Sequence, residues 1–220
     1  MLTPDTPNRD GQKTAFLTKP TVWRQLDPPL FDLLAARVAS GARSVREIET
    51  SRLMDGARYF SDVLRDDAAA RAVYMDTAFR ELAPADLLFF DPDNGLEVKS
   101  TRYGALGSSK YLFWREVEEA WTRGASLLIF QHYTREPREA LTNRLSGELS
   151  RRTGESLVAT IHTAHVLFLF CGQRTHLSRF ETAARIIETR WPGQLSDGRI
   201  GAETRGDPLA DTVPKHVRAR

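Results

Sequence analysis

Apolar residues along this chain follow two spacings, which predict that helices and strands alternate in its second half. Continuous apolar runs at 85–90 and 126–130 are typical of parallel strands that are covered on both faces. Apolar residues at helical spacing predict helices over 66–82, 111–121 and 137–152. The order is therefore helix, strand, helix, strand, helix.

Two closely spaced apolar segments follow and predict a different kind of strand pair. Residues 156–162 alternate between apolar and polar side chains, and 166–170 form a continuous apolar run. Too few residues separate them for a parallel crossover, so an antiparallel hairpin is expected. With a further helix over 176–191, the pattern predicts an α/β fold: a Rossmann-like, doubly wound, mostly parallel sheet with a terminal antiparallel hairpin strand.

The first half gives weaker periodic signals. Asp27, followed by two prolines, is typical of a helix start, and apolar residues at helical spacing continue to Gly41. Ser44 and Glu47 have the spacing of a capping box for a second helix. Residues 58–60 are interpreted as a short strand.

The length of 220 residues fits one domain with extensions. We divide it into a polar N-terminal segment at 1–13, a single α/β domain at 14–191, and a flexible tail at 192–220. The tail has too few apolar side chains to offset the entropy of ordering it.

Composition narrows the class of protein. A hydrophobic fraction of 41% allows a sizeable core, and the formal net charge is only +2. The pI of about 8.8 is less basic than a dedicated duplex-DNA binder usually shows, which leaves a nucleic acid open as a substrate. The single cysteine, Cys171, lies in an apolar stretch and is interpreted as a buried core thiol.

The chain shows no apolar run long enough to span a membrane and no signal peptide. We therefore expect a soluble, cytoplasmic protein without a membrane partner. The sequence does not indicate its oligomeric state.

Polar residues cluster directly after the two central strands. In open α/β sheets, ligands bind beyond the carboxyl ends of the strands, so we expect these clusters to face one cleft. Four residues are assigned catalytic roles: Asp91, Asp93, Asn94 and Lys110. Five are assigned to substrate binding: Pro92, Gly95, Gln131, His132 and Arg135.

Each of these residues also has a purely structural interpretation. Asp-Pro-Asp-Asn-Gly is a good turn sequence, in which Asp91 could cap the next segment. His132 could be a satisfied polar group, and Lys110 an ordinary surface lysine. The density of carboxylates and an amide after a buried strand favours function, because like charges this close need a compensating partner.

The strand that ends in Asp91-Pro92, the strand-helix-strand that follows and the final hairpin resemble the second half of class I S-adenosylmethionine-dependent methyltransferases. Amino-group members of that class carry Asp/Asn/Ser-Pro-Pro-Tyr/Phe, whose acidic or amide side chain and first prolyl carbonyl receive the target amine. Asp91 and Pro92 match the first two positions, whereas Asp93 and Asn94 depart from the last two.

The resemblance also implies a glycine-rich cofactor loop after a first strand. The first half of the chain has no Gly-x-Gly motif, and the candidate loop contains Asp5, Asp10 and Gly11. S-adenosylmethionine is the cofactor that the resemblance implies.

The motifs Phe-Phe-Asp-Pro-Asp-Asn-Gly-Leu-Glu, Ser-Lys-Tyr and Gln-His-Tyr-Thr-Arg are also similar to a group of bacterial proteins of unassigned function, over residues 1 to 185. Members of that group extend upstream of Met1 with another strand, which implies that this chain starts late.

Three functions follow. The leading hypothesis is a methyltransferase-like enzyme whose substrate is a small molecule such as a nucleotide, or a nucleic-acid base, because the cations suit phosphate. The second is a Mg²⁺-dependent phosphoryl-transfer enzyme or nuclease-type hydrolase, with Asp91, Asp93 and Glu97 as metal ligands. Asp-x-Asp after a strand resembles the haloacid dehalogenase motif, and Glu97-Val98-Lys99 resembles a nuclease acid-x-lysine pair. The third is a non-catalytic, nucleotide-binding Rossmann-like module.

Overall fold

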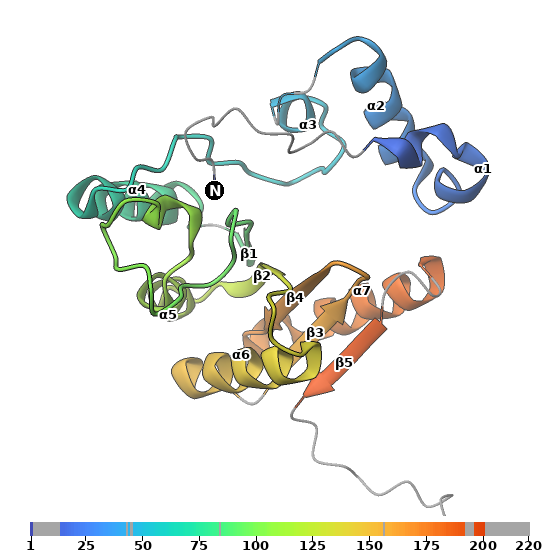
Figure 1. Ribbon diagram of the computed structural model, residues 1–220. Helices are drawn as coiled ribbons and strands as arrows, with labels where there is room; N and C mark the ends of the chain where they lie inside the picture. Colours follow the sequence, from blue (N-terminus) through green and yellow to red (C-terminus); the bar gives the residue numbers. More distant parts are fainter. Residues whose placement is uncertain are drawn as a thin grey trace, which may run out of the picture.

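The structure, a computed structural model, is a mixed α/β fold with an open five-stranded sheet (Figure 1). It describes residues 1, 14–42, 44, 46–83, 85–155 and 157–191, and the backbone of 196–200. The strands are β1 (Leu87–Phe90), β2 (Ser126–His132), β3 (Val158–His162), β4 (Val166–Cys171) and β5 (Ser196–Ile200).

The strand order in the sheet is β1-β2-β4-β3-β5. Only β1 and β2 pair in parallel, and every other neighbouring pair is antiparallel. The expected α/β class and the hairpin of β3 with β4 are therefore confirmed. The expectation of a mostly parallel sheet is not confirmed. The reason is that β4 lies between β2 and β3 and pairs with both of them in the antiparallel direction.

Strand direction determines which strand ends meet. Phe90 pairs with Ile129 at the carboxyl ends of β1 and β2. Because β4 runs antiparallel to both β2 and β3, the carboxyl end of β3 lies at the same edge of the sheet. We call this the carboxyl edge, and it is where the polar clusters of the sequence begin.

The helices are α1 (Pro20–Trp23), α2 (Pro28–Ala39), α3 (Arg46–Thr50), α4 (Ala68–Glu81), α5 (Trp114–Thr122), α6 (Arg138–Thr153) and α7 (Leu177–Arg190). Short 3₁₀ turns lie at Ala15–Thr18, Ser108–Lys110 and Arg174–His176. Asp27 caps α2 as predicted, accepting a hydrogen bond from the Leu30 amide at 3.1 Å. Residues 58–60 do not form a strand.

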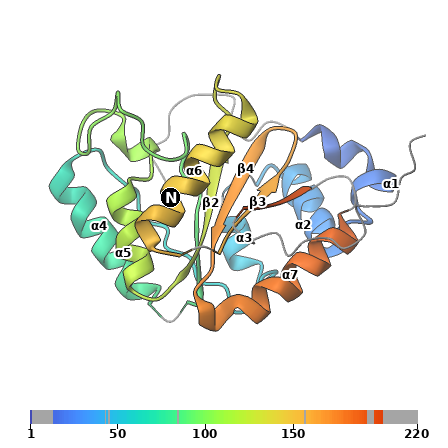
Figure 2. The same cartoon turned by 90° about the horizontal axis from the view of Figure 1, so that it is seen from below.

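One face of the sheet is covered by α4, α5 and α6, whose apolar side chains form the core with alternate strand residues. In Figure 2, α6 crosses in front of β2 and β4. Fully buried strand residues on this face are Leu127, Ile129, Leu167, Leu169 and Cys171. The Cys171 thiol is free and buried, as predicted, and burial raises its pKa to about 11.

The opposite face is covered less completely. Phe180 of α7 stacks on Phe170 of β4, with ring centroids 3.7 Å apart. In β1, however, Leu87 is 45% and Phe89 54% exposed. The prediction that this strand is covered on both faces was wrong, because a continuous apolar run does not specify whether each face has a partner.

The region expected to be a flexible tail contains β5, which pairs with β3 over Val158–His162. The outer edge of β3 offers unpaired backbone groups, and pairing with them does not require apolar side chains. Residues 192–195 and 201–220 lie outside the described residues, so the tail stays a prediction there. Among the described residues, no helix is long and apolar enough to cross a membrane.

Candidate functional site

The carboxyl edge brings together the polar segments that follow β1 and β2. The Asn94 amide donates to the Lys110 carbonyl oxygen at 2.8 Å, and the Leu112 amide donates to the Gly95 carbonyl oxygen at 3.0 Å. The Leu96 amide donates to Oε1 of Gln131 at 2.8 Å. The residues after β1, the residues before α5 and the end of β2 therefore form one connected unit, as the sequence predicted.

Gly95 allows this close approach. Its φ of +89° lies in the left-handed region, and a Cβ added there would lie 2.4 Å from Oε1 of Gln131. Gln131 is only 3% exposed, and its amide nitrogen donates to the His132 carbonyl oxygen at 2.8 Å. Both residues position the segment, whereas the sequence had assigned them to substrate binding.

Asp91, Asp93 and His132 are the titratable side chains of the edge, and all three are exposed. The pKa of Asp91 is raised chiefly because surrounding atoms displace water from the carboxylate, and also because Asp93 carries a like charge. His132 and the Met1 ammonium act in the opposite direction. Asp91 thus keeps contact with solvent while its charged form is disfavoured.

An amino group occupies the space beside these carboxylates. The Met1 ammonium donates to the main-chain carbonyl oxygen of Asp91 at 3.3 Å. Its pKa is lowered by burial, against the opposing effect of Asp91 and Asp93. The main-chain carbonyl oxygen of Asp91 is therefore accessible to a hydrogen-bond donor at this edge.

A buried ion pair between α4 and α5 supports the segment that precedes α5. Arg71 of α4 is 0% and Glu116 of α5 2% exposed, and their closest atoms lie 2.5 Å apart. Arg71 also donates to the carbonyl oxygens of Ser108 at 2.8 Å and Tyr111 at 2.6 Å. Glu116 accepts from the Phe113 amide at 2.9 Å. The pair fixes both ends of the segment that contains Lys110.

A second hydrogen-bonded group, which the sequence did not predict, lies at the same edge. The Tyr133 hydroxyl lies 2.8 Å from Nδ1 of His162, and Nε2 of His162 lies 3.0 Å from the Thr160 hydroxyl. Arg138 lies 4.5 Å over the Tyr133 ring. Burial raises the pKa of Tyr133. The position of His162 at the end of a predicted strand was the signal that could have identified it.

Not every predicted site residue belongs to this unit. Glu97 accepts a hydrogen bond from the Trp114 backbone, and burial raises its pKa against the favourable charge of Arg152. It does not join Asp91 and Asp93, and no group of three or more potential metal ligands is found in the part of the chain that the structure describes. Arg135 is exposed. Asp5, Asp10 and Gly11 lie outside the described residues.

The opposite, amino edge of the sheet carries a Ser-His-Asp chain. Nδ1 of His176 lies 2.9 Å from the Ser126 hydroxyl, and Nε2 lies 3.3 Å from Asp86, which also pairs with Arg179. Ser126 is 2% exposed and accepts from the Gln173 amide at 3.0 Å. Because its hydroxyl is buried and already engaged, this chain connects the start of α7 to the sheet rather than presenting a nucleophile.

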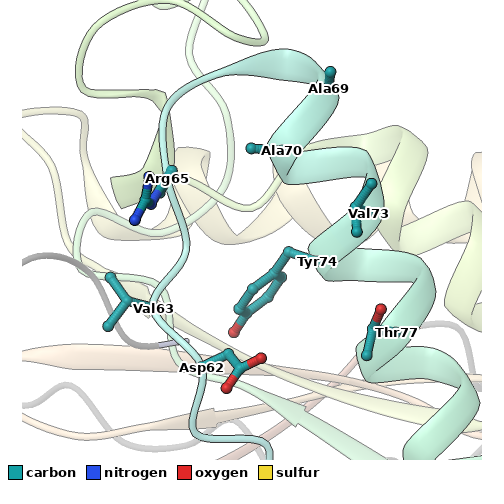
Figure 3. Close-up of a pocket in the computed structure, with 8 residues that line it drawn as sticks. All are labelled: Asp62, Val63, Arg65, Ala69, Ala70, Val73, Tyr74 and Thr77. Carbon is teal, nitrogen blue, oxygen red and sulfur yellow. The ribbon is translucent and has the colours of Figure 1, made fainter.

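A separate shallow pocket of about 470 Å³ lies between α4 and residues 62–65 (Figure 3). Its lining includes Asp62, Arg65 and the ring of Tyr74, whose pKa is raised to about 12 by burial. None of the predicted site residues lines it.

Comparisons with protein-family models, with curated proteins and with solved structures find no match to this chain. The function therefore has to be argued from the carboxyl edge itself.

Proposed function

We propose that this chain is a methyltransferase-like enzyme that acts on an amino group, with a nucleotide or a nucleic-acid base as substrate. The observation that carries the proposal is the amine-accepting arrangement at Asp91. The main-chain carbonyl oxygen of Asp91 accepts a hydrogen bond from an amine nitrogen at 3.3 Å, and the exposed carboxylates of Asp91 and Asp93 belong to the same segment. A target amine would take the place of that nitrogen.

The order of elements from β1 onward supports the proposed class. Asp91 and Pro92 follow β1, a parallel strand-helix-strand unit leads to β2, and the chain then forms the β3–β4 hairpin. This is the order of elements on which the resemblance to class I methyltransferases rests. In the proposal, Asp91 and the neighbouring carbonyl oxygens orient the amine, and Asn94 and His132 contact the rest of the acceptor.

S-adenosylmethionine would supply the methyl group. The oxygens at Asp91 accept hydrogen bonds and suit the amine that is to be methylated. The residues that the sequence assigns to the cofactor lie outside the described part of the chain. We therefore propose roles only for the acceptor side.

The test compares three proteins: wild type, Asp91→Asn and Asp91→Ala. For the wild type we expect S-adenosylmethionine, or its demethylated product, to raise the melting temperature. A ligand at 100 times its dissociation constant should stabilise by about 2.7 kcal/mol. We expect Asp91→Ala to lose methyl transfer from labelled S-adenosylmethionine to nucleosides with exocyclic amines, and Asp91→Asn, which keeps an acceptor oxygen, to retain part of it.

If Asp91 only caps a turn, the pattern differs. Asp91→Asn would then be silent in every assay, and Asp91→Ala would cost about 1 kcal/mol without affecting ligands. That result, or the absence of any thermal shift at millimolar cofactor, would reject the proposal.

A second candidate is the Mg²⁺-dependent enzyme. It is favoured by the like charges of Asp91 and Asp93, whose repulsion a divalent cation would relieve. In that case Mg²⁺ or Mn²⁺ should raise the melting temperature of the wild type but not of Asp93→Ala, and a chelator should abolish activity. Indifference of stability and activity to the chelator removes this candidate.

A further inference from the structure

The segment from Val98 to the first turn of α5, which lies between Glu97 and Glu116, carries a concentration of positive charge. Between Val98 and Arg115 there are four cations and no acidic residue, in a chain whose formal net charge is +2. The cations are Lys99, Arg102, Lys110 and Arg115. Arg115 lies 4.5 Å over the Tyr103 ring, and no ion pair is found for any of the four among the described residues. We call residues 98–115 the basic loop.

The basic loop is held in one conformation by local contacts. Gly104 and Gly107 have φ of +80° and +82°, and a Cβ on Gly104 would lie 2.6 Å from Cβ of Ala68. Asp66 accepts hydrogen bonds from the amides of Gly107 at 2.8 Å and Ser109 at 2.7 Å. These bonds lower the pKa of Asp66. Together with Arg71 beneath it, this support makes the loop a rigid projection.

Leu106 lies between the two left-handed glycines and is 95% exposed. The other apolar side chain of the loop with substantial exposure is Val98, at 39%, whereas Leu112 and Phe113 are buried. A single leucine is too small an apolar surface for a stable protein–protein contact. Held rigidly among cations, it has the properties of an apolar wedge that enters a base step.

The loop is joined directly to the candidate site. The Asn94 amide donates to the Lys110 carbonyl oxygen at 2.8 Å, which ties the end of the loop to the segment that contains Asp91. In Figure 1 the loop is the green segment between β1 and α5. A base inside a duplex cannot reach such an edge until it leaves the stack.

We propose that the basic loop docks a nucleic-acid duplex: Lys99 and Arg102 contact phosphates, Leu106 inserts between base pairs, and the unstacked base is presented to the carboxyl edge. This inference rests on the proposed function for the identity of the acceptor, but the docking itself can be measured without catalysis.

The experiment uses a short DNA duplex with 2-aminopurine beside a central mismatch, and an RNA duplex of the same sequence. Binding is measured by fluorescence anisotropy at several salt concentrations, and unstacking by the rise in 2-aminopurine fluorescence. The proteins are the wild type, Leu106→Ser and the double variant Lys99→Ala/Arg102→Ala. Matched controls are Val73→Ser on α4, where the valine is 67% exposed, and Arg185→Ala/Arg190→Ala on α7.

For the wild type we expect binding that weakens steeply with salt, together with a fluorescence rise. Lys99→Ala/Arg102→Ala should reduce the slope of log affinity against log salt by about 0.9 for each lost phosphate contact. Leu106→Ser should change affinity less than threefold but remove most of the fluorescence rise. Both control variants should behave as wild type.

Three outcomes would overturn the inference: no salt-dependent binding to either duplex, an unchanged fluorescence rise in Leu106→Ser, or equal losses in the α7 control. Preferred binding to a single strand or to phosphatidylserine vesicles would also overturn it. A duplex that is bound and unstacked but never methylated would reject the proposed function and leave the docking proposal intact. Methylation of a free nucleotide without duplex binding would reject the docking proposal and leave the proposed function intact.

Discussion

Two acidic side chains in the β1–α5 region, Glu116 and Asp91, differ in how well their negative charge is stabilised. Glu116 is buried, yet Arg71 and a backbone amide satisfy both of its oxygens. Asp91 is exposed, yet dehydration and the like charge of Asp93 raise its pKa, so its charged form is disfavoured. The buried Glu116 is thus fully hydrogen-bonded, whereas the exposed Asp91 keeps a raised pKa in spite of the compensating effect of His132.

This contrast indicates two separate roles: the buried ion pair supports the fold, and the exposed carboxylates are available to a ligand. A buried ion pair rarely adds stability over apolar residues of the same shape, but removal of one partner is costly. The Arg71–Glu116 pair is therefore best understood as a device that fixes the position of residues 108–113. The exposed carboxylates of the carboxyl edge do not take part in this support.

The largest expected effect tests the supporting pair. Arg71→Met leaves Glu116 buried without a cation, so we expect a loss of about 3–5 kcal/mol in the free energy of unfolding. The double variant Arg71→Met/Glu116→Leu should recover part of this loss. Urea denaturation measures both, with Arg123→Met as the control, whose exposed ion pairs should contribute at most about 1 kcal/mol. A single-variant cost as small as the control would show that the pair does not support the loop.

Gly95→Ala tests how closely the two polar segments must approach. The new methyl group meets Gln131 and also requires a positive φ, so we expect a cost of about 1–3 kcal/mol. Gly124→Ala is the matched control, because its φ of +90° is nearly the same and nothing lies within 4 Å of the added Cβ. The difference between the two isolates the contact with Gln131. Equal costs would mean that only the backbone conformation matters.

The sequence predicted local structure well where one signal dominated. Continuous apolar runs located β1 and β2, and the short connection at 163–165 correctly required an antiparallel hairpin. It could not predict that β4 pairs with β2, because that choice depends on contacts between distant segments. Nor could it predict the half-exposed face of β1, since an apolar run looks the same with one covered face or two.

The candidate site shows the same limit. The turn residues after β1 and the polar residues after β2 predicted that the two segments meet. The sequence did not separate the residues that position the edge, such as Gly95 and Gln131, from the exposed carboxylates. It also did not join His162 to Tyr133, because Tyr133 follows β2 and His162 ends β3, and these two strands are not neighbours in the sheet.

A smaller effect is expected for Tyr133→Phe. The variant removes the hydroxyl that bonds Nδ1 of His162, so we expect a loss of about 1 kcal/mol in the free energy of unfolding. The side-chain nitrogen signals of His162 should change in an NMR spectrum, because the bond to Nδ1 is lost while that to Thr160 remains. Tyr59→Phe, at a residue that is 37% exposed, is the control. An unchanged His162 signal would show that the bond does not persist in solution.

The smallest change in stability is expected for Asp91→Asn. Whether the variant is more or less stable than wild type is the informative result. The pKa of Asp91 is raised in the folded state, so ionisation opposes folding, and stability is lost as pH rises from the ordinary value of 3.8 through the folded pKa. Asp91→Asn removes this loss. The variant should therefore gain stability relative to wild type between pH 3.5 and pH 7, within about 0.5 kcal/mol for an exposed residue.

Glu148 supplies the opposite case on α6. Its pKa is lowered to about 2 by hydrogen bonds and charge from Arg151 and Arg152, so its contribution to stability is present above 4.5 and is lost as pH falls toward 2. Glu148→Gln should therefore be less stable than wild type at pH 7, and the difference should shrink in acid. Denaturation curves of both variants from pH 3 to pH 7 should diverge in opposite directions from wild type. If Asp91→Asn instead loses stability at neutral pH as Glu148→Gln does, then Asp91 is a compensated structural charge and the contrast that assigns function to the carboxyl edge fails.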